Sequence, residues 1–459
     1  MKLVCRVIIL VFLGTSLALA QTTPFQHVIV IFQENRTPDN LFNDPNLIAA
    51  GADIQTWGIN SKGQKINFSA QPLATTYDLG HSHKNFLAMY DGGKMDGADL
   101  ITCTPNAGTK CPANPQFAYA DNSDHTMDPY FQLAEQYGFG DRMFSTHQGD
   151  SYPGHQFIIG GTSAPTEFSE LFASSSPNMN GKGVAIGCTA PSGEYVKLVS
   201  PSGLENQTTY PCFERPTLID VLNGAGITWK YYTPLGYSMF TAPNSIRHLC
   251  VPNNGVCTGA DFQNNVVLNS KQILTDIGNC NLSQVNWVMP TAAQSDHPSS
   301  NKGLGPSWVA SIVNAIGNST CNPKYWSNTA ILVTWDDWGG WYDHVPPFRI
   351  GQTNGWGTGY AYGFRVPLVV VSAYTPNAYI SKLNHDFGSV LKFIEYVFGD
   401  ATGPLGPIPP GIYADAYADN LFDFFDFHQS PRVFKTIQAP RNAEYFINDT
   451  SPPEAPDTD

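Results

Sequence analysis

Short, continuous runs of apolar and β-branched residues constrain the fold of this sequence more than any other feature. We expect five of these runs to form buried strands: His27–Phe32, Ile227–Tyr232, Val285–Met289, Ala330–Trp335 and Val366–Ser372. Segments with helical patterns lie between them, at Met127–Tyr137, Pro216–Asn223, Trp308–Ile316 and Phe387–Phe398. Buried strands that alternate with helices predict the α/β class, with a mainly parallel central sheet flanked by helices on both faces.

The first twenty residues have the features of a secretory signal peptide. Lys2 and Arg6 supply positive charge, an apolar stretch runs from Val7 to Leu13, and Ala18-Leu-Ala20 is a small-x-small cleavage site. This stretch is too short to span a bilayer. We therefore expect a secreted or periplasmic protein with a signal peptide at 1–20, a single domain at 21–430 and a partly disordered tail at 431–459.

Acidic residues outnumber basic ones by 38 to 24, which gives a formal net charge of -14. Nucleic-acid binding depends on a basic face, so we expect no nucleic-acid partner. The acidic residues are scattered, as on a solvated surface, although some of them could hold a cation. We expect at most peripheral contact with a membrane, and the sequence leaves the oligomeric state open.

Cysteine usage fits an exported protein. Eight cysteines follow the signal segment, and an even number in an oxidising compartment predicts up to four disulfides. Sequential pairing would close loops rich in Gly, Pro and Asn between Cys103 and Cys111, Cys188 and Cys212, and Cys250 and Cys257. The long insertions at about 45–125 and 164–215 are expected to decorate the sheet as disulfide-stapled loops.

Oxygen-bearing side chains follow two of the expected strands. Glu34 and Asn35 come after the first, and Asp336 and Asp337 come after the run that ends at Trp335. An Asx turn is the plain interpretation of the first pair, and a solvated loop is that of the second. Adjacent carboxylates at a strand end repel each other unless a cation or a shared proton offsets the charge, so Asp336 and Asp337 favour a metal or phosphate site.

Histidines and one serine in loops add further candidates. His81 and His297 lie beside Asp, Gly or Pro residues, where an imidazole suits proton transfer or anion binding. Ser151 precedes an apolar, helix-like segment, where backbone N–H groups could point at an anion. A structural histidine and an N-cap serine are the alternatives when each residue is taken alone.

Taken together and in order, these segments resemble the phosphoesterase family of bacterial and plant nonspecific phospholipases C and related acid phosphatases. The resemblance spans about residues 26 to 400. It rests on Val28–Asp39 (VIVIFQENRTPD), Asp78–Ser82 (DLGHS), Ser151–Gln156 (SYPGHQ), Asp296–Pro298 (DHP), Thr334–Pro347 (TWDDWGGWYDHVPP) and Gly363–Leu368 (GFRVPL).

The resemblance implies an alkaline-phosphatase-like α/β core, with one catalytic domain over 21–430, and hydrolysis through a phosphorylated Ser or Thr. By position, it implies that Ser151 is the nucleophile and that His81 and His297 are catalytic and bind phosphate. The other implied roles are phosphate binding by Asn35 and His344, and one divalent metal ion held by Glu34, Asn35, Asp336 and Asp337. Oxygen ligands favour Ca²⁺, Mg²⁺ or Mn²⁺, with Zn²⁺ left open.

A secreted, metal-dependent phosphoesterase of the phospholipase C type, acting on a phospholipid or another phosphate ester, is therefore the leading hypothesis. An acid phosphatase that cleaves phosphate monoesters is the nearest alternative. Gly149-Asp-Ser151-Tyr-Pro153 also approaches the G-x-S-x-G elbow of serine carboxylesterases, which would leave Asp336 and Asp337 unexplained. A non-catalytic surface-binding protein is the remaining alternative.

Overall fold

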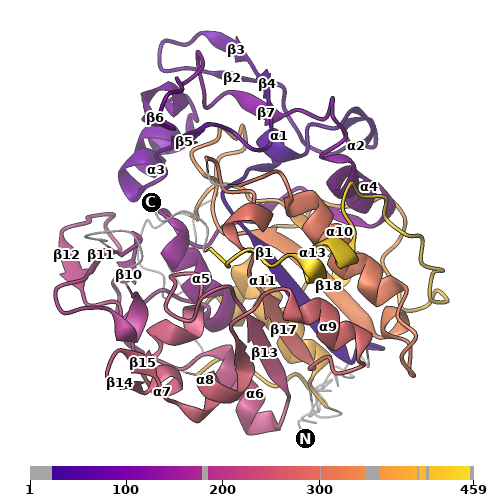
Figure 1. The fold of residues 1–459 in the computed structure, drawn as a ribbon. Helices are drawn as coiled ribbons and strands as arrows, with labels where there is room; N and C mark the ends of the chain where they lie inside the picture. Colours follow the sequence, from indigo (N-terminus) through magenta and orange to yellow (C-terminus); the bar gives the residue numbers. More distant parts are fainter. Residues whose placement is uncertain are drawn as a thin grey trace, which may run out of the picture.

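The computed structural model describes residues 23–177, 185–299, 301–347, 362–400, 403–409 and 413–454, so the expected signal peptide lies outside the described residues. Its centre is an eight-stranded sheet (Figure 1). In spatial order the strands are β16 (Val266–Val267), β13 (Trp229–Tyr232), β17 (Val285–Val288), β1 (His27–Gln33), β18 (Thr329–Trp335), β19 (Leu368–Val371), β8 (Gly138–Gly140) and β20 (Tyr379–Ser381). The first five are parallel, and β19 runs antiparallel to both of its neighbours. The predicted α/β class and all five predicted strands are confirmed.

Helices cover both faces of this sheet. Phe32 of β1 packs on Phe387, the first residue of α11 (Phe387–Val397), with ring centroids 5.3 Å apart. Trp335 is in register with Gln33, the residue after Phe32, and it packs on Tyr130 of α4 (Asp128–Gln136) at 5.3 Å. Because successive side chains in a strand point to opposite faces, α11 and α4 lie on opposite sides of the sheet.

The other expected helices are present with small shifts at their ends, as α6 (Leu218–Ala225) and α10 (Gly305–Gly317). Side chains fix where two of the helices begin. Asp386 accepts a hydrogen bond from Ser389 N–H at the start of α11, and Thr217 and Asp220 form a capping box at the start of α6. The remaining helices are α1 (Pro38–Leu41), α2 (Pro45–Ala49), α3 (His83–Tyr90), α5 (Ser151–Gly160), α7 (Arg247–Cys250), α8 (Ala260–Asn265), α9 (Gln272–Gly278), α12 (Ala414–Tyr417) and α13 (Ala443–Asn448).

Residues 57–120, here called the cap, form a layer above the sheet (Figure 1). The cap holds α3 and three strand pairs: β2 (Trp57–Ile59) with β3 (Lys65–Asn67), β4 (Ser69–Gln71) with β7 (Ala118–Ala120), and β5 (Tyr77–Leu79) with β6 (Cys103–Pro105). A second hydrophobic core joins it to the loops that follow β18, because Trp338, Trp341 and Phe364 are buried among cap residues. The cap is thus anchored on the segment that carries Asp336 and Asp337.

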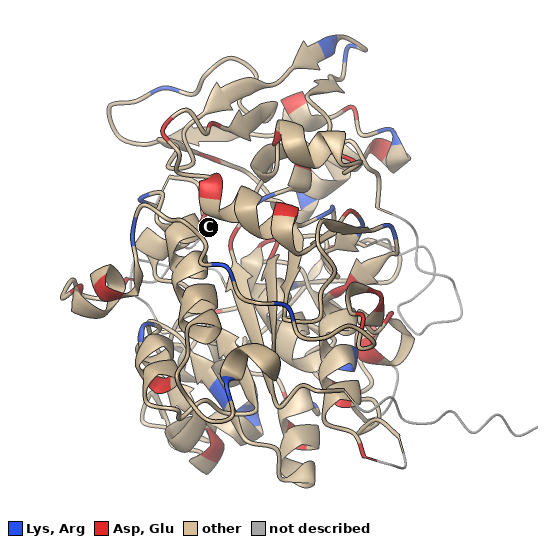
Figure 2. Ribbon diagram, turned by 90° about the vertical axis from the view of Figure 1, so that its right-hand side faces the viewer, with Lys and Arg blue, Asp and Glu red and all other residues tan. Residues whose placement is uncertain are grey.

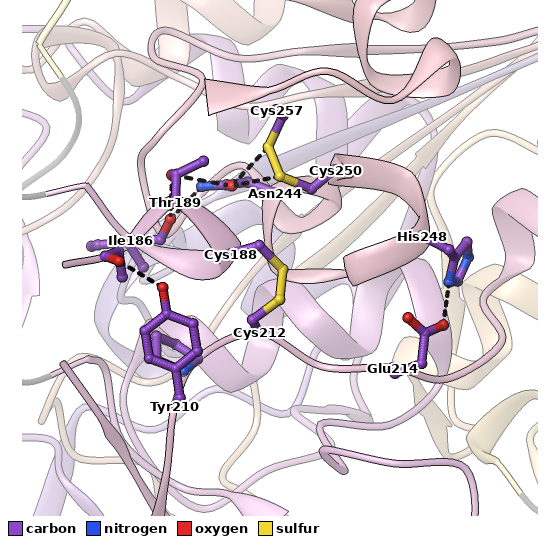
Figure 3. Close-up of a disulfide and its surroundings, with 12 residues drawn as sticks. Ile186, Cys188, Thr189, Tyr210, Cys212, Glu214, Asn244, His248, Cys250 and Cys257 are labelled. Atoms are coloured by element: carbon purple, nitrogen blue, oxygen red, sulfur yellow. Dashed lines mark hydrogen bonds and ion pairs between the residues drawn. A yellow bond between two sulfur atoms is a disulfide. The ribbon is translucent and has the colours of Figure 1, made fainter. Parts of the chain in front are cut away.

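The second insertion contains the small sheet β10 (Phe172–Ala173), β11 (Val196–Val199) and β12 (Gln207–Thr209). Cys188 and Cys212 form a disulfide beside it (Figure 3). The other disulfides join Cys103 to Cys111, Cys250 to Cys257 and Cys280 to Cys321, so the expected sequential pairing is confirmed. Asn244 lies beside the Cys250–Cys257 bridge and donates to the Ile186 carbonyl (Figure 3). The remaining two-residue strands are β9 (Met143–Phe144), β14 (Pro252–Asn253), β15 (Val256–Cys257) and β21 (His385–Asp386).

The part of the expected tail that the structure describes, residues 431–454, packs on the domain. Phe446 of α13 is fully buried against Trp308, with ring centroids 5.2 Å apart, and Phe434 packs on Trp326 at 4.8 Å. Residues 431–454 therefore contribute to the same core, beyond the boundary that we predict at residue 430.

Lys and Arg positions are interspersed with acidic ones in the view of Figure 2, without a continuous basic face in that view. Among the described residues, no helix is both long enough and apolar enough to cross a membrane.

Candidate active site

The loops that follow β1 and β18 meet at the carboxyl end of the sheet. The two strands are adjacent, parallel and in register up to their last residues, so the residues that come next lie side by side. Asn35 N–H donates to Asp336 Oδ1 over 2.8 Å, and Arg36 N–H donates to the Asp337 carbonyl over 3.0 Å. Glu34, Asn35, Asp336 and Asp337 are all fully buried. The structure therefore brings together the four residues that the sequence motif predicts as metal ligands.

A glycine allows this close approach. Gly339 has φ +60, and a Cβ at this position would lie 2.4 Å from the Asn35 carbonyl oxygen. The first glycine of the Gly-Gly pair after β18 is therefore required both by its backbone conformation and by the space available.

His155 on α5 completes a group of possible ligand atoms with Glu34 and Asp336, all within 4.8 Å of one another. Its Nε2 lies 3.4 Å from Glu34 Oε1 and 3.8 Å from Asp336 Oδ2. Burial lowers the pKa of His155 to about 4, against the opposite effect of Asp336. Sequence reasoning missed this residue, although its position four residues after Ser151 on a helix places it on the same face as the serine.

This donor set suits a divalent cation. Burial opposes ionisation of Asp336, but hydrogen bonds and His155 hold the pKa of its carboxyl below the usual value, so the charge is retained. Neutral His155 has a lone pair to donate, and Asn35 Oδ1 is buried without a hydrogen-bond partner among the described residues. The imidazole adds a nitrogen donor to the predicted oxygen ligands, and this donor suits Zn²⁺, one of the four metals that the sequence leaves open.

Ser151 is the first residue of α5, where Asp150 is the N-cap, so the N-cap interpretation of the serine does not hold. Its buried Oγ donates to Asp337 Oδ2 over 3.2 Å. The other oxygen of Asp337 accepts from Gly339 N–H over 2.6 Å, so this carboxylate connects the start of α5 to the loop after β18. Ser151 thus combines a helix N-terminus with a neighbouring carboxylate.

His81 and His297 come from the cap and from the loop after β17, and their ring centroids lie 6.4 Å apart. His81 Nδ1 lies 2.7 Å from the Leu79 carbonyl, and His297 Nδ1 lies 2.7 Å from the Pro298 carbonyl. Donation from each Nδ1 to a carbonyl fixes the orientation of both rings. His81 Nε2 lies 3.2 Å from Asn35 Nδ2, so His81 adjoins the predicted metal site.

Asp296, next to His297, has a supporting role. Its Oδ2 accepts from Tyr130 over 2.8 Å and from Trp335 Nε1 over 2.9 Å, so it holds the loop onto α4 and β18. Burial raises the pKa of Asp296 to about 6, opposed by Arg36.

His344 does not have the position that the motif implies. Its Nδ1 lies 2.8 Å from Asp39 Oδ2 and its Nε2 lies 3.1 Å from Asp53 Oδ1, while Asp343 is paired with Arg365. Because both ring nitrogens face carboxylates, the prediction that His344 contacts phosphate finds no support in this geometry.

Comparison with known proteins matches residues 25–400 to a single family profile, described as the Phosphoesterase family. The chain belongs to the Phosphoesterase family. This member is 25% identical to "Hemolytic phospholipase C" of Pseudomonas aeruginosa, over 87% of its own length and 56% of that protein. It is 24% identical to "Phospholipase C A" of Mycobacterium tuberculosis, over 89% and 78% of the two chains. The chain therefore spans little more than half of the Pseudomonas relative.

Among solved structures, a protein in the alkaline phosphatase superfamily from Vibrio parahaemolyticus aligns with this phosphoesterase over 84% of this chain and 70% of that chain. The TM-score is 0.35 and the identity 9%, values too low to support a shared fold by themselves. The α/β assignment rests on the order and direction of the strands.

Proposed function

We propose that this chain is a metal-dependent phosphoesterase of the phospholipase C type, which cleaves a phospholipid between glycerol and phosphate through a phosphoserine. Family membership and the names of its relatives support the reaction class. The observation that carries the mechanism is the position of Ser151 Oγ, 3.2 Å from Asp337 and beside the buried group of Glu34, His155 and Asp336.

Glu34, Asn35, Asp336 and Asp337, joined by His155, are the residues that would hold a divalent cation. When bound, such a cation would screen the negative charge of the phosphate and lower the pKa of a nearby hydroxyl. The chain itself supplies the burial and the orientation of these side chains.

Ser151 gives its hydroxyl proton to Asp337 Oδ2, its hydrogen-bond acceptor, and its Oγ attacks phosphorus. The Oγ–phosphorus bond forms, the bond from phosphorus to the glycerol oxygen breaks, and diacylglycerol leaves. The first N–H groups of α5 offer donors to the phosphoryl oxygens as negative charge builds up. Water then attacks the phosphoserine, which releases the phosphorylated headgroup and regenerates the Ser151 hydroxyl.

His81 contacts Asn35, and its ring centroid lies 6.4 Å from that of His297; we assign both histidines to the phosphoryl oxygens and the leaving group. With Nδ1–H donating to a backbone carbonyl, Nε2 of each neutral ring is an acceptor, and His81 Nε2 accepts from Asn35 Nδ2. In the protonated imidazolium form, Nε2 carries the hydrogen that can be donated to a phosphate oxygen or to the departing alkoxide. A serine carboxylesterase would need a base such as histidine in hydrogen-bond contact with the nucleophile, whereas Ser151 Oγ donates to a carboxylate.

A turnover panel tests this proposal with four substrates: phosphatidylcholine, phosphatidylethanolamine, sphingomyelin and p-nitrophenyl phosphate. Each is measured before chelation, after chelation, and after a divalent metal is restored. We expect phospholipid cleavage that chelation abolishes and metal restores. Turnover that survives complete removal of metal would contradict the proposal, and turnover of p-nitrophenyl phosphate alone would assign the chain to the phosphatases.

A further inference from the structure

His83 joins three separate parts of the chain next to the proposed nucleophile. It is the first residue of α3 and is buried, with 2% of its surface exposed. Its Nδ1 lies 3.1 Å from the carbonyl of Gln148, in the loop that leads to Ser151. Its Nε2 lies 3.3 Å from the carbonyl of Gly203, in the turn between β11 and β12. The cap and the second insertion therefore meet beside the nucleophile loop (Figure 1).

Two exposed leucines accompany these contacts. Leu87 follows His83 by four residues on α3, so the two share one flank of the helix, and its side chain is 48% exposed. Leu204 follows Gly203 directly and is 59% exposed. Leu87 and Leu204, here called the leucine rim, thus present apolar side chains to solvent from two insertions that His83 holds together.

Charged side chains of both signs lie next to the leucine rim, because exposed Lys84 follows His83 on α3 and Glu205 follows Leu204. Glu205, which follows Leu204, is paired with Lys197 at 3.4 Å and accepts from Ser174 Oγ over 2.7 Å. The chain as a whole carries a net charge of -14, which would repel anionic lipid headgroups. A surface that suits this rim therefore has headgroups without net charge and an apolar interior beneath them.

We propose that the leucine rim docks on zwitterionic phospholipid bilayers such as phosphatidylcholine, and so holds the loop before Ser151 at the lipid surface. This inference rests on the proposed function, in which a phospholipid reaches Ser151. Insertion of exposed leucines below the headgroups removes apolar surface from water, and two side chains give reversible rather than permanent attachment.

Vesicle sedimentation tests the rim in a Ser151→Ala background, where the proposed mechanism predicts that the lipid stays intact. The probe is phosphatidylcholine vesicles, and the test variant carries Leu87→Ser and Leu204→Ser. We expect at least tenfold weaker vesicle binding than in Ser151→Ala alone. Val433→Ser is the matched control, because Val433 is also an exposed apolar residue, at 89%. Its neighbour Phe434 packs on Trp326, which precedes β18, so Val433 lies at the end of the sheet opposite to the active site. This control should bind normally.

Turnover of a soluble phosphate ester separates docking from chemistry. For this measurement the Leu87→Ser, Leu204→Ser double variant keeps the wild-type serine at position 151. It should turn over the soluble substrate within twofold of the wild-type rate and lose turnover of phospholipid in vesicles. Binding by the double variant within twofold of its parent, or binding only to anionic vesicles, would overturn the proposal. Because sedimentation needs no turnover, an inactive wild-type chain would reject the proposed function while leaving the docking result readable.

Discussion

Two groups of buried acidic side chains are built from the same two segments, residues 34–39 and 336–344, and we propose that only one of them holds a metal ion. Both bring two carboxylates and a histidine close together. The first, here called the metal cluster, consists of Glu34, His155 and Asp336; the second, here called the arginine cluster, consists of Asp39, Asp343, His344 and Arg365.

The arginine cluster carries its own positive charge. Arg365 donates to both oxygens of Asp343, over 2.8 and 3.0 Å, and to Asp39 over 3.1 Å, and all three side chains are fully buried. This two-pronged pairing satisfies the carboxylates within the protein. In the metal cluster, the ion-pair contact that the structure gives for Asp336 is with His155, whose lowered pKa keeps it neutral. Carboxylates and a histidine that lie close together are therefore not enough for a metal site. What matters is whether the protein itself, as with Arg365, supplies the positive charge that balances the carboxylates.

The largest expected difference between the clusters is in activity. Asp336→Ala should remove bound metal and lower turnover about a thousandfold, roughly 4 kcal/mol of barrier, because a ligand is lost. Asp343→Ala should leave the metal content of each folded molecule unchanged. Elemental analysis and turnover on the same preparations measure both effects. Full metal occupancy in Asp336→Ala would remove the distinction between the clusters.

The arginine cluster should matter for the stability of the fold. Arg365→Met leaves Asp39 and Asp343 buried without their partner, so we expect the free energy of unfolding to fall by roughly 3–5 kcal/mol. Lys94→Met, which breaks the exposed pair with Asp91, should leave the free energy of unfolding almost unchanged, because solvent screens the pair. Urea unfolding compares the two variants. Equal, small losses would show that the arginine cluster is not a structural unit.

The smallest effect should come from His344, and it should depend on pH. Burial lowers the pKa of His344, but Asp39 and Asp343 outweigh this and raise it above the usual value. Protonation therefore stabilises the fold fully below about pH 6.5, and this contribution is lost as the pH rises through the raised pKa. His344→Gln should cost about 1 kcal/mol at pH 5.5 and less at pH 8.5, measured by denaturant unfolding. A hundredfold loss of turnover would instead restore the phosphate-binding role.

The sequence predicts that Glu34 and Asp336 lie together, but not that His155 joins them. The apolar runs before Glu34 and Asp336 are long and uninterrupted, so their pairing and the meeting of their ends follow from parallel-sheet geometry. Sequence spacing does not give the surroundings of His344, because Gly339 and Gly340, both with positive φ, turn the chain after Asp337. The helical spacing of four residues places His155 on the face of Ser151, but its contact with Glu34 at the end of β1 is a tertiary contact that this spacing does not encode.

A trapped phosphoenzyme is the most direct test of whether the metal cluster serves a serine nucleophile. Enzyme mixed with substrate, quenched in acid within the turnover time and digested should yield phosphate on the peptide that contains Ser151, as read by mass spectrometry. Ser151→Ala should retain its metal and lack both the phosphopeptide and nearly all turnover. An unmodified Ser151 peptide, together with a Ser151→Ala variant that keeps more than a tenth of wild-type activity, would contradict the account.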